Sequence, residues 1–383
     1  MVARGPPAVG HGRGGLVSAR EVVTRVGVVG CGRISPAYLT APGRFPNLRV
    51  VACSDLDVTR AEKRAQQFGV PIACDVDSLI AMPDVDVVVN LTPPAVHHQV
   101  STAAVRAGKS VYVEKPLAVD REQAAELLEL ARSHGVEVAC SPDTFLSPVL
   151  QTCRSLLDQG AIGTPVGAVA FFATRGPELR HPDPAFFYQQ GAGPLLDMGP
   201  YYVTALVNVL GPVRRVSAAS TSGESERLVM SGPQRGSLVP VQVPTHVSAN
   251  LEFESGTVCS LMTSFDVWAA NLPRIEIYGT EGSLSIPDPD GYEGQVRLHQ
   301  AGWTAWREVP GPQYTAGRGI GLADLAAALH GDRTPRAGGA LAYHVLDTLL
   351  SVLESGQRGT HINVESSCIR PDQVGAGGVI DVP

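Results

Sequence analysis

The sequence of 383 residues predicts an α/β protein with two domains: a doubly wound parallel sheet, then an α/β domain with a large, mostly antiparallel sheet. Two patterns predict this class. Between residues 25 and 140, short apolar runs alternate with segments of helical period, as in βαβ units. After residue 150, runs of alternating polarity separated by turn residues indicate antiparallel strands. The length also exceeds what one ordinary core supports.

The first domain is expected over residues 24–146, after an extension of residues 1–23. The extension is rich in glycine and arginine and lacks the apolar stretch of a secretory signal, so we expect it to be disordered. Five apolar runs predict the strands of the sheet: "RVGVV", "LRVVACS", "VDVVVNL", "KSVYV" and "VEVAC". Acidic residues and glycines mark the ends of the helices between them: Asp57, Asp120, Gly69 and Gly135.

The second domain is expected over residues 147–365, followed by a tail over residues 366–383. Ser147 and Pro148 predict the start of its first helix, "SPVLQTCRSLLDQG". Strands are predicted in "VGAVAFFAT", "HVSANLEFES", "GTVCSLMTSF", "RIEIYGT" and "GSLSIPD". Further helices are predicted in "GPLLDMGPYYVTALVNVLG", "GIGLADLAAALHG" and "GALAYHVLDTLLSVLESG". Residues 222–245, rich in serine, glycine and proline, are expected to form a surface loop.

The composition argues against several classes of partner. The 30 basic and 37 acidic residues are well mixed, and the net charge of -7 indicates no basic surface for nucleic acid. No stretch reaches the roughly 18 consecutive apolar residues of a membrane span, so we expect a cytoplasmic protein without membrane association. The seven cysteines form no CxxC motif or Cys/His cluster, and no set of His, Asp and Glu has metal-ligand spacing. We therefore expect no metal.

The segment "VGVVGCGRIS" carries a Gly-x-Gly-x-x-Ser motif directly after the first predicted strand. Gly30 permits a tight turn, Gly32 lets the backbone approach a pyrophosphate, and the small Ser35 allows close packing of helix on strand. Asp55 ends the second strand, where a carboxylate accepts a ribose hydroxyl and repels the extra phosphate of NADP. Arg60 is close enough to leave NADP open. The motif therefore predicts NAD as cofactor, with NADP as the alternative.

A second polar signal is the Glu-Lys-Pro of "VYVEKPLAV", which follows the predicted strand "KSVYV". Taken alone, Glu114 and Lys115 would be solvated charges at a strand end. Ligands of an open parallel sheet bind outside the carboxyl ends of its strands, so Lys115 is expected in the crevice beside the nicotinamide. Burial or a positive nicotinamide would lower the pKa of Lys115 and suit it to proton transfer. Glu114 would pair with Lys115 or line the cofactor pocket.

Three stretches together, "GCGRIS", "TPPAVHHQVSTAAVRAGKSVYVEKPLA" and "GAGPLLDMGPYYVTALVNVLGPV", resemble the glucose-fructose oxidoreductase and inositol dehydrogenase family, Gfo/Idh/MocA. The resemblance implies a Rossmann domain followed by an α/β domain whose open sheet serves as an oligomer interface, in a homodimer or homotetramer. The cofactor contacts expected from the turn motif and the resemblance are Gly30, Gly32, Arg33, Ile34, Ser35, Asp55, Thr92, Pro93, His97, Glu114 and Lys115.

The resemblance also implies catalytic groups. It places Lys115 in the active site, and it matches a D-x-G-x-H motif to residues 197–201, so that Tyr201 stands where the family has histidine. Positions 197 and 201 project on one helix face. A tyrosine, with an ordinary pKa near 10, needs help to act as a base. We therefore hypothesise a Tyr201/Lys115 pair, with Asp197 binding hydroxyls or orienting the ring; the alternative is that Tyr201 packs in a helix interface.

Substrate contacts are expected from the tract "RGPELRHPDPAFFYQQGAGP", which is rich in donors, acceptors and aromatics, as sugar binding requires, and from the end of the last strand of the first domain. The candidates are Asp143, Glu178, His181 and Tyr188. His97 matches a family histidine near the cofactor, although a helix-capping role explains it equally well. Other polar residues are interpreted as structural: His246, Asp266, Trp268 and His344.

These features predict an NAD(P)-dependent oxidoreductase that transfers a hydride between nicotinamide and a hydroxyl or keto carbon of a sugar, cyclitol or related polyol. One alternative is a glycoside hydrolase that retains NAD and oxidises its substrate transiently. The other is a dinucleotide-binding protein without catalysis, which the presence of both Lys115 and Asp197 disfavours.

Overall fold

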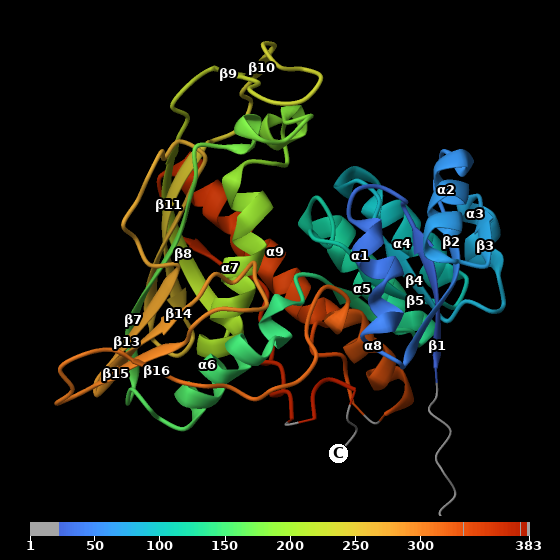
Figure 1. Ribbon diagram of the computed structural model, residues 1–383. Coiled ribbons are helices and arrows are strands. Elements are labelled where there is room, and N and C mark those ends of the chain that lie inside the picture. Colours follow the sequence, from blue (N-terminus) through green and yellow to red (C-terminus); the bar gives the residue numbers. More distant parts are fainter. Residues whose placement is uncertain (1–22, 332, 376, 381–383) are drawn as a thin grey trace, which may run out of the picture.

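The computed structural model describes residues 23–331, 333–375 and 377–380, so the predicted extension lies outside the described residues except for Val23. The N-terminal part is built on a parallel sheet in the order β3-β2-β1-β4-β5-β6 (Figure 1). Its strands are β1 (Thr24–Val29), β2 (Leu48–Ser54), β3 (Ile72–Cys74), β4 (Val87–Asn90), β5 (Ser110–Val113) and β6 (Val138–Cys140). This order confirms the predicted doubly wound sheet and adds the short strand β3, which the sequence patterns did not indicate.

Helices cover both faces of this sheet. They are α1 (Ser35–Leu39), α2 (Val58–Phe68), α3 (Val76–Ala81), α4 (His97–Arg106) and α5 (Arg121–His134), with the 3-10 turns η1 (Ala41–Gly43), η2 (Pro94–Val96) and η3 (Thr144–Leu146). Buried residues of α3, α4 and α5 pack on one face, and those of α1 and α2 pack on the other. The caps predicted for α5 hold: Asp120 accepts the backbone N–H of Gln123 at 2.8 Å, and Gly135 ends α5 in the left-handed conformation. Asp57 precedes α2, but its side chain makes no capping hydrogen bond.

The second sheet has nine strands in the order β16-β15-β14-β13-β7-β12-β11-β8-β17. The strands are β7 (Pro165–Ala173), β8 (Val213–Thr221), β11 (His246–Phe253), β12 (Val258–Ser264), β13 (Ile275–Gly279), β14 (Gly282–Ile286), β15 (Arg297–Gln300), β16 (Arg307–Glu308) and β17 (Ile362–Asn363). Only β7 and β12 pair in parallel, so the sheet is mostly antiparallel, as predicted. The long strand β8, "VRRVSAAST", was missed because its charged and small residues hide the alternation.

Helices α6 (Pro148–Asp158), α7 (Pro194–Leu210) and α9 (Gly339–Arg358) pack beside one face of this sheet (Figure 1). Nearly all of α7 is buried; it packs against α9, and both helices contact strands of this sheet. The fit between the two helices is close, because a Cβ on Gly199 would lie 2.6 Å from a methyl carbon of Leu349. The sheet and α9 therefore hold α7 as a rigid support for the polar residues at its N-terminal end.

Helix α8 (Ile320–His330) belongs to the later part of the chain but packs against the parallel sheet. The side-chain amide of Asn47 donates to the carbonyl of Ala323 at 2.9 Å, and the Thr24 hydroxyl contacts the His330 ring at 3.1 Å. The turn that precedes α8 is thereby fixed at the junction between the two sheets. The domain limits remain a prediction. Helix α8 lies in the part of the chain assigned to the second domain but packs against the sheet of the first.

Residues 174–193 and 222–245 form a small lobe beyond the N-terminal end of α7 (Figure 1). The lobe holds the turns η4 (Pro177–Leu179) and η5 (Ala185–Tyr188) and a two-stranded hairpin of β9 (Glu226–Leu228) and β10 (Leu238–Pro240). The predicted surface loop therefore contains a hairpin. Across the ranges that the structure describes, no helix is long and apolar enough to cross a membrane.

Candidate active site

The turn between β1 and α1 has the shape that a dinucleotide requires. Gly30 has a φ of +99°, its N–H donates to the Ser54 carbonyl at 2.8 Å, and a Cβ there would meet the Leu91 backbone at 2.8 Å. A Cβ on Gly32 would meet nothing within 4 Å, so this glycine faces open space. The Ser35 hydroxyl donates to the Gly32 carbonyl at 2.8 Å, which shows how serine replaces the third glycine. The open approach above Gly32 fits a pyrophosphate.

Asp55, just past the end of β2, connects this turn to the next one. One carboxylate oxygen accepts the N–H of Cys31 at 2.9 Å, and the other accepts the N–H of Asp57 at 3.0 Å. Arg60 lies 3.3 Å from the same carboxylate and is half-exposed. Acceptor capacity remains on the carboxylate for a ribose hydroxyl. The residues of this region therefore fit the adenosine half of NAD.

Lys115 lies at the carboxyl end of β5 and reaches α7. Its ammonium donates to the Asp197 carboxylate at 2.8 Å and to the Asp197 carbonyl at 2.6 Å. The same nitrogen lies 5.5 Å from the centroid of the Tyr201 ring. The side chains of Lys115 and Asp197 are 17% and 25% exposed, so both are reached from solvent. The structure thus brings together the three residues expected to be catalytic, although Lys115 faces the tyrosine ring rather than its hydroxyl.

Lys115 and Tyr201 both hold their protons in this arrangement. Burial is the largest single effect and lowers the pKa of Lys115, but Asp197, Tyr201 and Glu114 together raise it by more, so the net pKa lies above its ordinary value. The expectation of a lowered lysine pKa is therefore wrong for this state of the site. Burial raises the pKa of Tyr201, and the cations Lys115 and Arg318 offset only part of that effect. At neutral pH the site presents an ammonium group and a protonated phenol.

Glu114 does not pair with Lys115. Its carboxylate accepts the Tyr38 hydroxyl at 2.6 Å and the Ser141 hydroxyl at 2.8 Å, and Arg318 lies 3.8 Å away. Ser141 in turn accepts the backbone N–H of Lys115 at 2.9 Å. These contacts fix the Glu-Lys-Pro turn, whose Lys115–Pro116 peptide is cis. Glu114 therefore supports the site from within the first domain.

Two family models cover most of the described chain. A model of an oxidoreductase family with an NAD-binding Rossmann fold matches residues 24–141, and a model of the GFO/IDH/MocA C-terminal domain matches residues 150–285. The chain belongs to the Gfo/Idh/MocA oxidoreductase family. Its first domain is accordingly an NAD-binding Rossmann domain, and the protein is an enzyme of the dehydrogenase and reductase class.

Relatives of this family member include enzymes with different substrates. The trans-1,2-dihydrobenzene-1,2-diol dehydrogenase of Mus musculus is 30% identical over 68% of this chain and 74% of its own length. The 1,5-anhydro-D-fructose reductase of Ensifer adhaerens is 26% identical over 90% of this chain and 99% of its own length. Among solved structures, the apo form of levoglucosan dehydrogenase is 22% identical and superimposes with a TM-score of 0.79 over 90% of this chain and 99% of that one, a likeness of fold.

His97 begins α4 and is buried against the Glu-Lys-Pro turn. One ring nitrogen lies 2.7 Å from the Pro116 carbonyl, and the other lies 2.7 Å from the Thr92 carbonyl. The histidine therefore braces two turns of the Rossmann domain rather than presenting a free nitrogen. Thr92 and Pro93 lie after β4, and the Thr92 hydroxyl donates to Asn90 at 2.6 Å. Arg33 is exposed and Ile34 half-buried at the start of α1.

Asp143 has a different placement from the expected one. It is fully buried, and its carboxylate accepts the Tyr292 hydroxyl and the N–H groups of Gly319 and Gly321, at 3.0 and 3.1 Å. These contacts occupy the carboxylate oxygens of Asp143, so they are not available to accept hydrogen bonds from a substrate. Asp143 therefore anchors the turn before α8 and does not present an open carboxylate.

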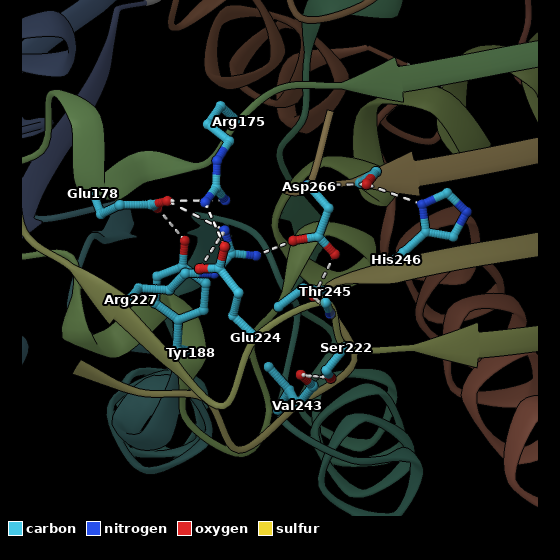
Figure 2. A network of polar contacts seen from close by, with 12 residues as sticks. Arg175, Glu178, Tyr188, Ser222, Glu224, Arg227, Val243, Thr245, His246 and Asp266 are labelled. Atoms are coloured by element: carbon cyan, nitrogen blue, oxygen red, sulfur yellow. Dashed lines mark hydrogen bonds and ion pairs between the residues drawn. The ribbon is translucent and has the colours of Figure 1, made fainter. Parts of the chain in front are cut away.

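Two of the predicted substrate residues of the lobe, Glu178 and Tyr188, point toward one another (Figure 2). Tyr188 is fully buried and donates its hydroxyl to Glu178, which is 2% exposed. Arg227 lies 3.5 Å from Glu178 and also pairs with Asp266. His181 contacts the Asp183 carbonyl at 2.7 Å and packs against phenylalanine rings. Glu178 and Tyr188 thus belong to an internal network of the lobe, and Asp266 has the structural placement that was expected.

The sequence patterns did not single out three polar residues near Lys115 and Tyr201. Arg318 precedes α8, and its guanidinium lies 3.5 Å from the Tyr201 hydroxyl. Tyr292 lies in the loop after β14, as does Asp290, whose pKa is raised by burial and lowered in part by Arg318 and Lys115. The one local signal was a lone arginine between Gly317 and Gly319 directly before a helix, which does not reveal its neighbours.

Proposed function

We propose that this protein is an NAD(P)-dependent oxidoreductase that transfers a hydride between nicotinamide and a hydroxyl or keto carbon of a sugar, cyclitol or related polyol. One observation carries the proposal: the Lys115, Asp197 and Tyr201 side chains converge at the carboxyl ends of the parallel strands, where ligands of such sheets bind. The Gly30 to Ser35 turn and Asp55 would hold the pyrophosphate and ribose of the cofactor. The cofactor supplies or accepts the hydride.

The side chains have distinct roles in this proposal. Lys115 and Tyr201 donate hydrogen bonds to the oxygen of the reacting carbon, and one of them gives it a proton during reduction. Asp197 holds the ammonium in place, and its second carboxylate oxygen, which has no hydrogen-bond partner among the described residues, accepts a neighbouring substrate hydroxyl. Because both donors are protonated at rest, the site is prepared for reduction of a carbonyl group.

Asp55 supports a preference for NAD, since a carboxylate just past the end of β2 repels the 2′-phosphate of NADP. Arg60, 3.3 Å from that carboxylate, could turn toward a phosphate instead. The substrate class is supported by relatives whose names specify sugar or diol substrates. The measured ratio of kcat/KM with NADH and NADPH tests the cofactor preference.

We also propose a homodimer or homotetramer formed through the second sheet. Strand register places Val169, Phe171, Val258 and Met262 on the face that points away from the residues packed under α7. Val258 is 44% exposed, and its cross-strand partners are Gly167 on β7 and Glu252 on β11. Such a face can bury apolar area in an isologous contact. Sedimentation equilibrium of the wild type and of Phe171→Glu would show a dimer or tetramer, and dissociation of the variant.

Absorbance at 340 nm tests the function. The protein is mixed with NADH or NADPH and pooled keto-sugars, then with NAD or NADP and pooled sugars, cyclitols and diols. We expect turnover with at least one pool, absent in Lys115→Met. Cofactor binding without turnover of any pool in either direction would refute the proposal, and aglycone release without net NADH would indicate transient oxidation instead.

A further inference from the structure

Arg318 stands between two glycines in a turn that is fixed from both sides. Gly317 and Gly319 have φ values of +142° and +99°, a region that glycine adopts readily. The Gly319 N–H donates to the buried Asp143 carboxylate at 3.0 Å, and the Arg318 carbonyl accepts the Arg44 guanidinium at 2.7 Å. The backbone of this turn therefore fixes the position of the Arg318 side chain in the domain junction.

The Arg318 guanidinium lies between Tyr201 and Glu114. One terminal nitrogen approaches the Tyr201 hydroxyl at 3.5 Å, at the long limit of a hydrogen bond, and the other lies 3.8 Å from Glu114. That second nitrogen is buried without a hydrogen-bond partner among the described residues. The side chain is 18% exposed, so few water molecules can compete for its N–H groups. An arginine held in this way has donors left to act on a neighbour or on a ligand.

Lys115 cannot perform the same task. Its ammonium is bound to the carboxylate and the carbonyl of Asp197 and faces the tyrosine ring at 5.5 Å from the centroid. Arg318 is the cation that contacts the hydroxyl itself. If the hydroxyl accepts an N–H from Arg318, its own proton points elsewhere and is free for a substrate oxygen. The guanidinium also stabilises the phenolate that remains after the proton has left.

We propose that Arg318 is a positioning residue for proton transfer, which aims the Tyr201 hydroxyl at the substrate and stabilises its anionic form. The inference rests on the proposed function. Lys115 then places a positive charge over the face of the Tyr201 ring. Glu114, which is held by Tyr38 and Ser141, keeps the Arg318 guanidinium in place. The histidine role of the family motif is thus divided between a tyrosine and an arginine from another element.

Several charged or titratable groups face Tyr201 and set its pH response. They are Lys115 and Glu114 from the Rossmann domain, Asp197 from α7, Arg318 from the turn before α8, and Asp290 and Tyr292 from the loop after β14. Burial raises the pKa of Tyr201, and Arg318 is one of two cations that oppose this rise. Removing Arg318 should therefore shift the alkaline limb of the reduction rate, where the phenol loses its proton, to higher pH.

A double-mutant cycle of Arg318→Met and Tyr201→Phe tests the proposal, with Arg318→Lys as the variant that retains the charge. With full-length protein and a substrate found in the 340 nm assay, we expect Arg318→Met to reduce kcat about 10- to 100-fold, part of the roughly 100- to 10,000-fold that positioned proton transfer supplies. Its alkaline limb should move up, and Arg318→Lys should restore part of the rate.

In the Tyr201→Phe background, Arg318→Met should cost nothing further, because the two residues act through one hydroxyl. NADH binding and the melting temperature of each variant serve as folding controls. Equal losses in both backgrounds, or an alkaline limb that stays in place, would overturn the role of Arg318. Absence of turnover in the wild type itself would refute the proposed function instead, so the two failures are distinguishable.

Discussion

The lobe and the domain junction each contain a polar cluster, and the two clusters are similar in composition but different in construction. In the lobe, Arg227 is 1% exposed and contacts the carboxylates of Glu178, Glu224 and Asp266 (Figure 2). At the domain junction, Lys115 and Asp197 remain partly exposed. In the lobe cluster the charged groups pair with one another, whereas in the junction cluster hydrogen-bond donors and acceptors remain available to a ligand. Residue type alone therefore does not distinguish an active site from an internal network, and spare hydrogen-bonding capacity next to solvent supports the junction as the proposed active site.

The largest effect is expected from Lys115→Met, which removes the ammonium from the junction. We expect kcat/KM to fall about 1,000-fold, within the range for loss of a positioned proton donor, with little change in melting temperature. Lys109→Met is the matched control, because Lys109 precedes the same strand β5 and donates to the carbonyls of Met82 and Val85. That control should lose stability and keep activity. Comparable activity losses in both variants would show that the effect of Lys115→Met is not specific to the junction.

Arg227→Met tests the lobe. It leaves the buried Glu178 facing only the cation of Arg175, and breaking a buried ion pair costs about 3 to 5 kcal/mol of unfolding free energy. Urea denaturation should show this loss, while the folded fraction keeps its NADH affinity. Arg214→Met, at the exposed ion pair with Glu252, should change stability very little. A folded Arg227→Met protein with normal stability but no turnover would assign the lobe cluster to catalysis.

Tyr201→Phe removes one hydroxyl from the junction and retains the ring beneath Lys115. We expect kcat to fall about 100-fold, at the lower end for general acid-base catalysis, with unchanged NADH affinity. Tyr202→Phe is the control on the same helix, because the Tyr202 hydroxyl is buried and has no hydrogen-bond partner among the described residues. If Tyr201→Phe turns over normally, Lys115 alone or with water carries the proton.

The sequence patterns were most informative where the determining interactions are local. The Gly30 turn, the Asp120 and Gly135 caps and the apolar strands of the Rossmann domain depend on residues a few positions apart, and they were predicted correctly. The candidate site was predicted in part, because the family motifs pointed to Lys115, Asp197 and Tyr201. Arg318 could not be predicted, since its partner Glu114 lies 204 positions earlier and only the tertiary fold joins them.

Glu178 and Tyr188 were predicted to contact the substrate, but the sequence does not show which way their side chains point. A tract rich in donors and aromatics is compatible with sugar binding and with an internal network, and the direction of each side chain decides between them. In the structure the Tyr188 hydroxyl points at Glu178, and Arg227 comes from a hairpin almost 40 residues further along the chain. The directions of these side chains depend on that hairpin, and its two strands are too short to show a recognisable sequence pattern.

The smallest effect is expected from His97, which supports the turn beside Lys115. Its substitution should change stability and its pH dependence. Burial lowers the pKa of His97, and its contacts with the Pro116 and Thr92 carbonyls offset only part of this. The unfolded chain therefore binds more protons below about pH 6.5, and the unfolding free energy falls as the pH drops through that value. One proton limits the slope to about 1.4 kcal/mol per pH unit. His97→Asn should be less stable at pH 8 but flatter in its pH dependence between pH 7 and 5, by urea denaturation. Parallel curves for wild type and variant would show that other groups carry the acid sensitivity, and that the turn beside Lys115 does not depend on a neutral His97.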